Sequence, residues 1–143
     1  MTIGYNYLGS NGRLGNQMFQ YAALRGIAAN KNYDWVIPEP TNYGSGNYGL
    51  FDCFEMSSVS KHNFGLINSN SIQTGQFHFS QEFFDQCPDN VNLHDYFQSE
   101  KYFENIKDLI RSDFTFKQEI ANPCSEILSE LKNPIFIHVR RGD

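Results

Sequence analysis

The chain has 143 residues, of which 40% are hydrophobic and 19% charged, and it contains 13 Phe and 8 Tyr. This composition excludes fibrous and disordered proteins and allows a folded domain with an aromatic core. The net charge of −5 argues against a broad nucleic-acid surface. No apolar run approaches the ~18 residues needed to cross a bilayer, and residues 1–19 lack the features of a signal peptide. We therefore expect a soluble cytoplasmic protein, at most peripheral to a membrane.

The first forty residues predict a strand, a helix and a second strand. Residues 3–7 alternate in polarity as a half-buried strand does, and residues 17–31 are rich in Ala, Leu, Met and Gln. The apolar side chains of that helix point in nearly all directions, which predicts a buried helix. A second strand at 34–39 follows the first after roughly 30 residues, the repeat length of a βαβ unit. The fold class is therefore α/β, Rossmann-like, with a mostly parallel sheet.

The rest of the chain is less regular until its last third. Residues 41–79 are rich in Gly, Asn and Ser and predict loops and short elements, whereas an extended piece at 92–97 leads into a helix capped by Ser99. A further helix is expected to begin with Pro123 at its first position, after an Asn122 cap. The alternation of residues 134–140 then predicts a strand.

Cysteine and histidine spacing gives no indication of a metal site. Cys53, Cys87 and Cys124 are far apart and contain no C-x-x-C pair, so we expect reduced, buried thiols. The four histidines form no H-x-x-x-H or H-E-x-x-H pair. We expect neither a metal nor a cofactor.

The stretch "GSNGRLGNQ" is the first candidate for ligand binding. Gly9, Gly12 and Gly15 join the first strand to the buried helix, where backbone N–H groups can approach an anion or a sugar. The G-x-x-G-x-x-G spacing departs from the dinucleotide fingerprint, although Glu39 lies near the position of a ribose-binding acid. Phosphate or nucleotide contact and a tight structural turn both fit this stretch.

The stretch "HVRRGD" is the second candidate. Arginine carries five donors in a rigid fork that matches phosphate oxygens, so Arg140 or Arg141 is suited to binding a diphosphate. A surface pair bonded to Asp143 fits the same residues. His138 lies on the same side of the predicted strand as Arg140, where a hydrogen-bonded spacer is the simplest role.

Four ordered segments, "GRLGNQMFQYA", "YGLFDCF", "YFQSEKYFENIKDLIRSDF" and "HVRRGD", closely resemble the α-1,2-fucosyltransferases of glycosyltransferase family 11. The resemblance implies transfer of L-fucose from GDP-fucose to the 2-OH of a galactoside, with inversion and without a metal. The implied partners are GDP-fucose and a galactose-containing glycan acceptor. The implied fold is the amino-terminal half of a GT-B-like glycosyltransferase, an enzyme of two facing Rossmann-like domains.

The same resemblance implies roles for individual residues. Arg140 and Arg141 would bind the GDP diphosphate, and Arg140 would stabilise the charge on the leaving phosphate. His138 and Asp143 would shape that loop. The residues of the opening turn that would face the cleft are Arg13, Gly15, Asn16 and Gln17. The group that accepts the acceptor's proton is not assigned, and the carboxylates considered for it are Asp52, Glu55, Glu100 and Asp143.

Family members continue well beyond the arginine segment, so we expect residues 1–132 to form the amino-terminal domain. Residues 133–143 are then the first strand and arginine loop of a truncated donor-binding domain. Two alternatives remain open. One is a non-catalytic carbohydrate-binding or assembly module derived from such an enzyme. The other is a nicotinamide-dependent oxidoreductase, which the glycine spacing and the HVRRGD ending disfavour.

Overall fold

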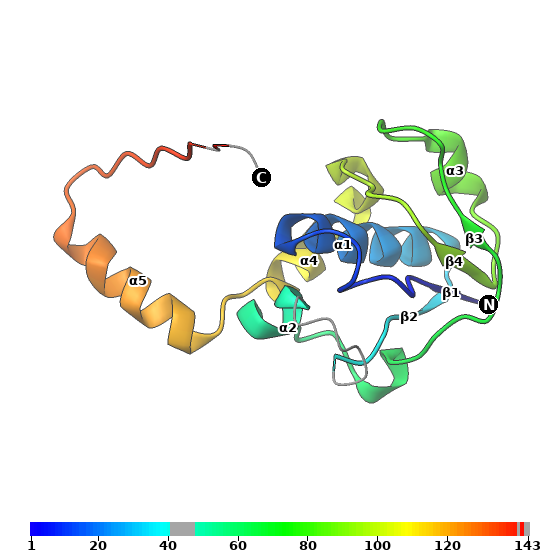
Figure 1. Ribbon diagram of the computed structural model, residues 1–143, viewed down its shortest axis with the longest axis horizontal. Helices are drawn as coiled ribbons and strands as arrows, with labels where there is room; N and C mark the ends of the chain where they lie inside the picture. The colour runs from blue at the N-terminus through cyan, green and yellow to red at the C-terminus, as the bar shows by residue number, and fades with distance from the viewer. Residues whose placement is uncertain (41–47, 140, 142–143) are drawn as a thin grey trace.

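A computed structural model describes residues 1–40, 48–139 and 141, and its centre is a small sheet of parallel strands (Figure 1). The strands are β1 (Thr2–Gly4), β2 (Asp34–Val36), β3 (Ser71–Ile72) and β4 (Val91–Leu93). Their order is β2-β1-β4-β3, and Ile3 of β1 is paired with Trp35 on one side and Val91 on the other. All pairs are parallel. The predicted α/β class with a parallel, Rossmann-like sheet is confirmed.

Helix α1 (Leu14–Lys31) connects β1 to β2 and contains ten buried residues, more than any other described helix or strand. It packs against α2 (Gly49–Cys53), α3 (Gln81–Gln86) and the two 3-10 turns η2 (Glu100–Tyr102) and η3 (Glu104–Ile106). Its side chains therefore contact protein on several sides. This explains why its apolar residues are not confined to one stripe. The helix ends at Asn32, whose left-handed conformation lets its N–H bond the carbonyl oxygens of the last turn. The predicted βαβ unit is confirmed.

Shorter helices follow β2, and several of them pack around α1. They are α2 (Gly49–Cys53), η1 (Lys61–Asn63), α3 (Gln81–Gln86), η2 (Glu100–Tyr102), η3 (Glu104–Ile106), α4 (Lys107–Asp113) and α5 (Gln118–Glu130). The helix predicted after Ser99 is thus divided into two 3-10 turns and α4. In this region Tyr102 and Ile110 are buried, whereas Leu109 is exposed.

Aromatic rings hold the core together, as the composition predicts. Phe97 packs edge-on against Tyr102 with ring centroids 5.2 Å apart, and Tyr21 packs edge-on against Trp35 at 5.8 Å. Such edge-to-face pairs add to the burial energy of the rings themselves. Cys87 belongs to the same core, and burial raises the pKa of its thiol to about 11.

The expectation of buried cysteines is correct for Cys87, but Cys53 is half-buried and Cys124 is exposed. Cys124 lies on α5, a helix that has no buried residue. The expectation therefore fails where the chain leaves the core.

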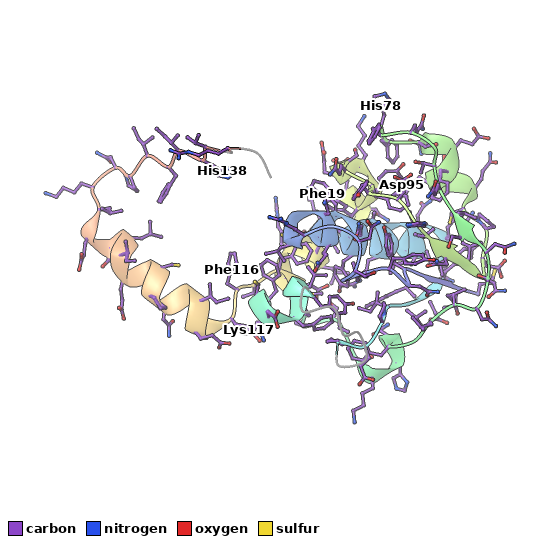
Figure 2. All side chains as sticks on the ribbon, viewed as in Figure 1. Phe19, His78, Asp95, Phe116, Lys117 and His138 are labelled. Carbon is purple, nitrogen blue, oxygen red and sulfur yellow. The ribbon has the colours of Figure 1, made fainter. Side chains whose placement is uncertain are left out.

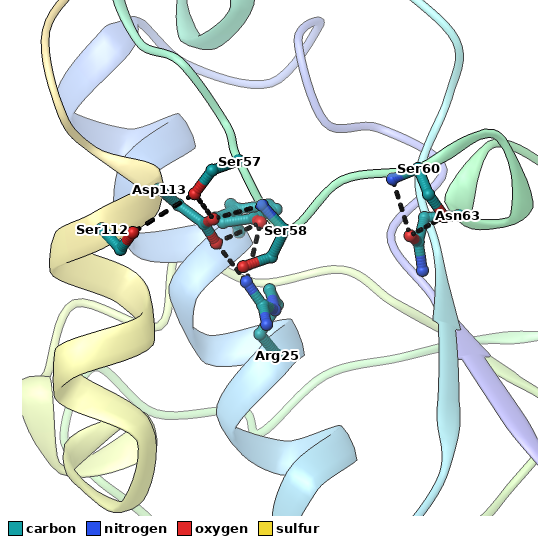
Figure 3. Close-up of polar contacts among 8 residues, drawn as sticks. Arg25, Ser57, Ser58, Ser60, Asn63, Ser112 and Asp113 are labelled. Atoms are coloured by element: carbon teal, nitrogen blue, oxygen red, sulfur yellow. Dashed lines mark hydrogen bonds and ion pairs between the residues drawn. The ribbon is translucent and has the colours of Figure 1, made fainter.

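A buried ion pair links α1 to the end of α4 (Figure 3). Arg25 donates to the carboxylate of Asp113, whose side chain is fully buried. The same carboxylate accepts from the Tyr21 hydroxyl at 2.7 Å and from the Ser58 backbone N–H at 2.8 Å. Arg25 also lies over the Trp35 ring, 5.1 Å from its centroid. These contacts compensate the charges for their loss of water.

Helix α5 extends away from the sheet and α1, and the described residues after it turn back but stay exposed (Figure 1). The helix begins at Gln118, so the prediction that Pro123 opens it was wrong. The amide of Ala121 already bonds the Lys117 carbonyl, and Pro123 then costs the helix one internal hydrogen bond. The predicted strand is also absent over the described residues 134–139. A strand requires a neighbour for its backbone hydrogen bonds, and no described strand lies beside this segment.

Candidate functional site at the carboxyl edge of the sheet

The turn between β1 and α1 requires glycine at two positions. Gly9 and Gly12 have φ angles of +91° and +83°, a region that other residues rarely adopt. Arg13 precedes the helix without a side-chain cap, and the first turn of α1 contains no acidic residue. The amides of this first turn lack carbonyl partners within the helix and carry its positive dipole end.

The structure places the four predicted residues of this turn differently from one another. Arg13 and Gly15 are exposed, and Asn16 is half-buried with its side-chain oxygen 2.9 Å from the Gln98 amide that donates to it. Gln17 is fully buried, and its amide donates to the Gly12 carbonyl at 3.2 Å. Gln17 therefore supports the turn from inside, whereas the other three residues are accessible.

Two further loops reach the same edge of the sheet, because the carboxyl ends of parallel strands lie together. Residues 73–77 follow β3 and residues 94–96 follow β4. In the order β2-β1-β4-β3, the later strands are added on the other side of β1 from β2, so the strand order reverses between β1 and β4. In open α/β sheets, ligands bind in the crevice at this point.

A cavity of about 420 Å³ lies among these loops. Its lining residues are Asn11 from the β1 turn, Gln73, Gly75, Gln76 and Phe77 from the loop after β3, and His94, Asp95 and Tyr96 from the loop after β4. The seven residues of the two later loops were not among the residues predicted from the sequence. Their position after β3 and β4 is the feature that could have indicated them, but both strands are very short.

Asp95 is the anchor of the cavity wall (Figure 2). Its carboxylate accepts hydrogen bonds from the hydroxyl and the backbone N–H of Thr74 and from the backbone N–H of Tyr96. The hydroxyl of buried Tyr5 donates to the Asp95 carbonyl. Burial raises the pKa of Tyr5 far above its usual value, so this hydroxyl remains a donor throughout the working pH range. Asp95 is therefore held in place by hydrogen bonds from Thr74 and from the buried Tyr5.

His94 is oriented by two neighbours. The Tyr7 ring lies against its imidazole with centroids 4.4 Å apart and planes tilted by 32°. The Gln73 side-chain nitrogen lies 3.4 Å from Nδ1. These two contacts restrict the orientation of the imidazole, which lines the cavity.

A second cavity, of about 580 Å³, lies between the start of α1 and the segment from η2 to α4. Its floor is apolar and includes Met18, Phe19, Phe103, Ile110 and Phe114, and charged side chains of η2, η3 and α4 rim it. Gly15 lines this cavity, whereas none of the four predicted residues of the turn lines the cavity at the sheet edge.

Of the HVRRGD segment, the described residue His138 is not at the sheet edge. Arg140 and Asp143 lie outside the described residues. His138 and Arg141 are exposed, and His138 lies far from Asp95 in Figure 2. Exposed apolar residues precede them, including Ile135 with 87% of its surface accessible.

The three described carboxylates considered as proton acceptors do not line the cavity at the sheet edge. Asp52, Glu55 and Glu100 are all exposed, and Glu100 lies at the rim of the apolar cavity. Within the described ranges, no three His, Cys, Asp or Glu side chains gather as metal ligands would. No helix there has the length and apolar character to cross a bilayer.

Comparison with known proteins gives one match. The family model described as Glycosyl transferase family 11 matches residues 2–143. No curated protein and no solved structure matches the chain. The match spans both the βαβ unit with its glycine turn and the HVRRGD segment. The chain therefore belongs to glycosyltransferase family 11.

Proposed function

We propose that this family 11 member transfers L-fucose from GDP-fucose to the 2-hydroxyl of a galactoside, forming an α-1,2 linkage with inversion. The observation that carries the proposal is the family match over residues 2–143. The parallel sheet, with loops that gather at its carboxyl edge, is compatible with the proposal because open α/β sheets bind their ligands in a crevice of this kind.

In the proposed reaction, the acceptor oxygen attacks the anomeric carbon of fucose while the bond from that carbon to the diphosphate oxygen breaks. The acceptor's hydroxyl proton passes to a base, and GDP leaves with the bonding electron pair. Negative charge grows on the departing phosphate, so a cation is most effective there in the transition state. We assign this role to Arg140, with Arg141 on the same diphosphate and with His138 and Asp143 shaping the loop. The arginines supply the positive charge that a metal supplies in other transferases.

The test is a transfer assay with GDP-fucose and lactose, followed by mass spectrometry of the product. Arg140→Ala is expected to lower the rate at least about a hundredfold, the usual cost of losing one group that stabilises transition-state charge. Arg111→Ala is the matched control, because Arg111 is 77% exposed and pairs only with Asp108 among the described ion pairs. Equal rates for Arg140→Ala and the unaltered chain would contradict the assigned role.

A second candidate function is a carbohydrate-binding module without turnover. The observation in its favour is that His138 and Arg141 are exposed and that His138 lies far from Asp95 at the sheet edge. This module would bind a glycan yet release no GDP from GDP-fucose. Measuring lactose binding and GDP release on one preparation separates the two functions.

A further inference from the structure

We infer that the cavity lined by residues 73–77, 94–96 and Asn11 binds one sugar ring of the glycan acceptor. The inference rests on the proposed function, since it names where that reaction's acceptor is held. The cavity lies at the carboxyl edge of the sheet beside the β1 turn, where the crevice of an open α/β sheet is expected. Its volume of about 420 Å³ is within the range of small-molecule sites.

The lining has the two kinds of surface that a sugar ring needs. A pyranose presents a C–H face, which packs against aromatic rings whose faces carry negative potential. Phe77 and Tyr96 supply exposed rings at the cavity, and Phe77 is 81% accessible. Sugar hydroxyls both donate and accept hydrogen bonds, and the amides of Gln73 and Gln76 offer both functions.

The charge of the lining excludes the nucleotide part of the donor. None of the eight lining residues is Lys or Arg, and Asp95 contributes a carboxylate. A diphosphate placed here would meet a negative group without a compensating cation. A neutral polyhydroxyl ligand has no such cost, so the lining favours the acceptor sugar over GDP.

The walls are fixed before any ligand arrives. Thr74 and Tyr5 hold Asp95, and the Tyr7 ring holds His94. The amide of fully buried Gln20 donates to the Asn11 carbonyl at 3.1 Å. Rigid walls reduce the entropy lost on binding, which matters for a weakly bound sugar.

The test measures lactose binding by saturation-transfer difference NMR on the whole chain, with and without two substitutions. Phe77→Ala and Gln76→Ala alter exposed side chains, so both variants should fold normally. Each is expected to weaken lactose binding about fivefold or more, the effect of losing one good contact. The matched controls are Leu66→Ala and Gln81→Ala, which remove an exposed apolar and an exposed amide side chain outside the cavity. Both controls should bind lactose as the unaltered chain does.

Two results would overturn the inference: no saturation transfer to lactose from the unaltered chain, or equal signals from the cavity variants and their controls. The outcome is separable from that of the proposed function. If the chain binds lactose in this cavity but transfers no fucose, the proposed sugar site is supported and the proposed activity is contradicted. If the chain transfers fucose and Phe77→Ala leaves the KM for lactose unchanged, the activity is supported and the sugar site is contradicted.

Discussion

At the scale of single residues, the buried carboxylate of Asp113 accepts four hydrogen bonds (Figure 3). It accepts from Arg25, Tyr21, Ser57 and the Ser58 backbone. Asp113→Asn keeps the shape but removes the negative charge, which leaves the Arg25 guanidinium buried without its counterion. We expect the free energy of unfolding to fall by about 3–5 kcal/mol, measured by urea denaturation.

The control for this prediction is Asp108→Asn, which removes the same charge from the same helix. Asp108 and its partner Arg111 are 85% and 77% exposed and lie 3.5 Å apart. Exposed pairs contribute little, so the change should be within about 0.5 kcal/mol. Similar losses in both variants would show that charge alone, and not burial, determines the effect.

At the scale of elements, Gly26 sets how closely α1 approaches the 3-10 turns after Ser99. A Cβ atom at Gly26 would lie 1.9 Å from the Tyr102 carbonyl oxygen and 2.7 Å from the Phe103 Cα. Both are backbone atoms, so α1 and η2 must separate to admit a methyl group. Gly26→Ala should therefore lower the free energy of unfolding by at least about 2 kcal/mol, which thermal denaturation would reveal as a lower Tm.

Gly15→Ala on the same helix is the matched control. A Cβ atom there meets nothing within 4 Å, and alanine favours a helix more than glycine does. Its stability should be unchanged or higher by up to about 1 kcal/mol. If Gly26→Ala were as stable as Gly15→Ala, the close approach of α1 to η2 would be wrong.

The difference between local and long-range information explains which parts of the fold and the site could be predicted. The βαβ unit follows from nearby residues, because the composition of α1 and the interval between β1 and β2 are readable over a short stretch. The cavity wall at Asp95 and Gln73 is assembled by pairing of β3 with β4, two strands of three residues or fewer. Strands β1 and β2 are equally short, but the 18-residue helix α1 between them marks the unit, whereas only the six-residue α3 lies between β3 and β4. Sequence patterns could therefore not bring these side chains together.

The segment 134–139 shows the opposite failure. Its alternation predicts a strand, yet residues 134–139 are not in a strand in this structure. Polarity patterns report a preference for a half-buried surface, and the backbone still needs a hydrogen-bonding neighbour. Roles for Arg140 and Arg141 therefore remain predictions of the sequence.

At the scale of the whole molecule, stability is expected to be divided at Lys117. Phe116 still touches Phe54, with ring centroids 4.9 Å apart, and the Lys117 amide bonds the Cys53 carbonyl at 3.1 Å (Figure 2). Beyond this point no residue of α5 is buried, and Ile127 is 62% exposed. A helix of 13 residues is marginal in water without packing.

We therefore predict that amide hydrogens of α5 exchange at least about a thousandfold faster than those of α1, measured by hydrogen–deuterium exchange and mass spectrometry. The buried residues of α1 open only with the core, whereas α5 can unwind without exposing any buried apolar surface. Equal protection of the two helices would contradict the predicted difference in local stability. It would require that the exposed apolar side chains of α5, such as Ile127 and Leu128, are covered in solution. Repeating the measurement at tenfold dilution would then identify the cover: protection that falls on dilution comes from a second molecule, and protection that persists comes from the same chain.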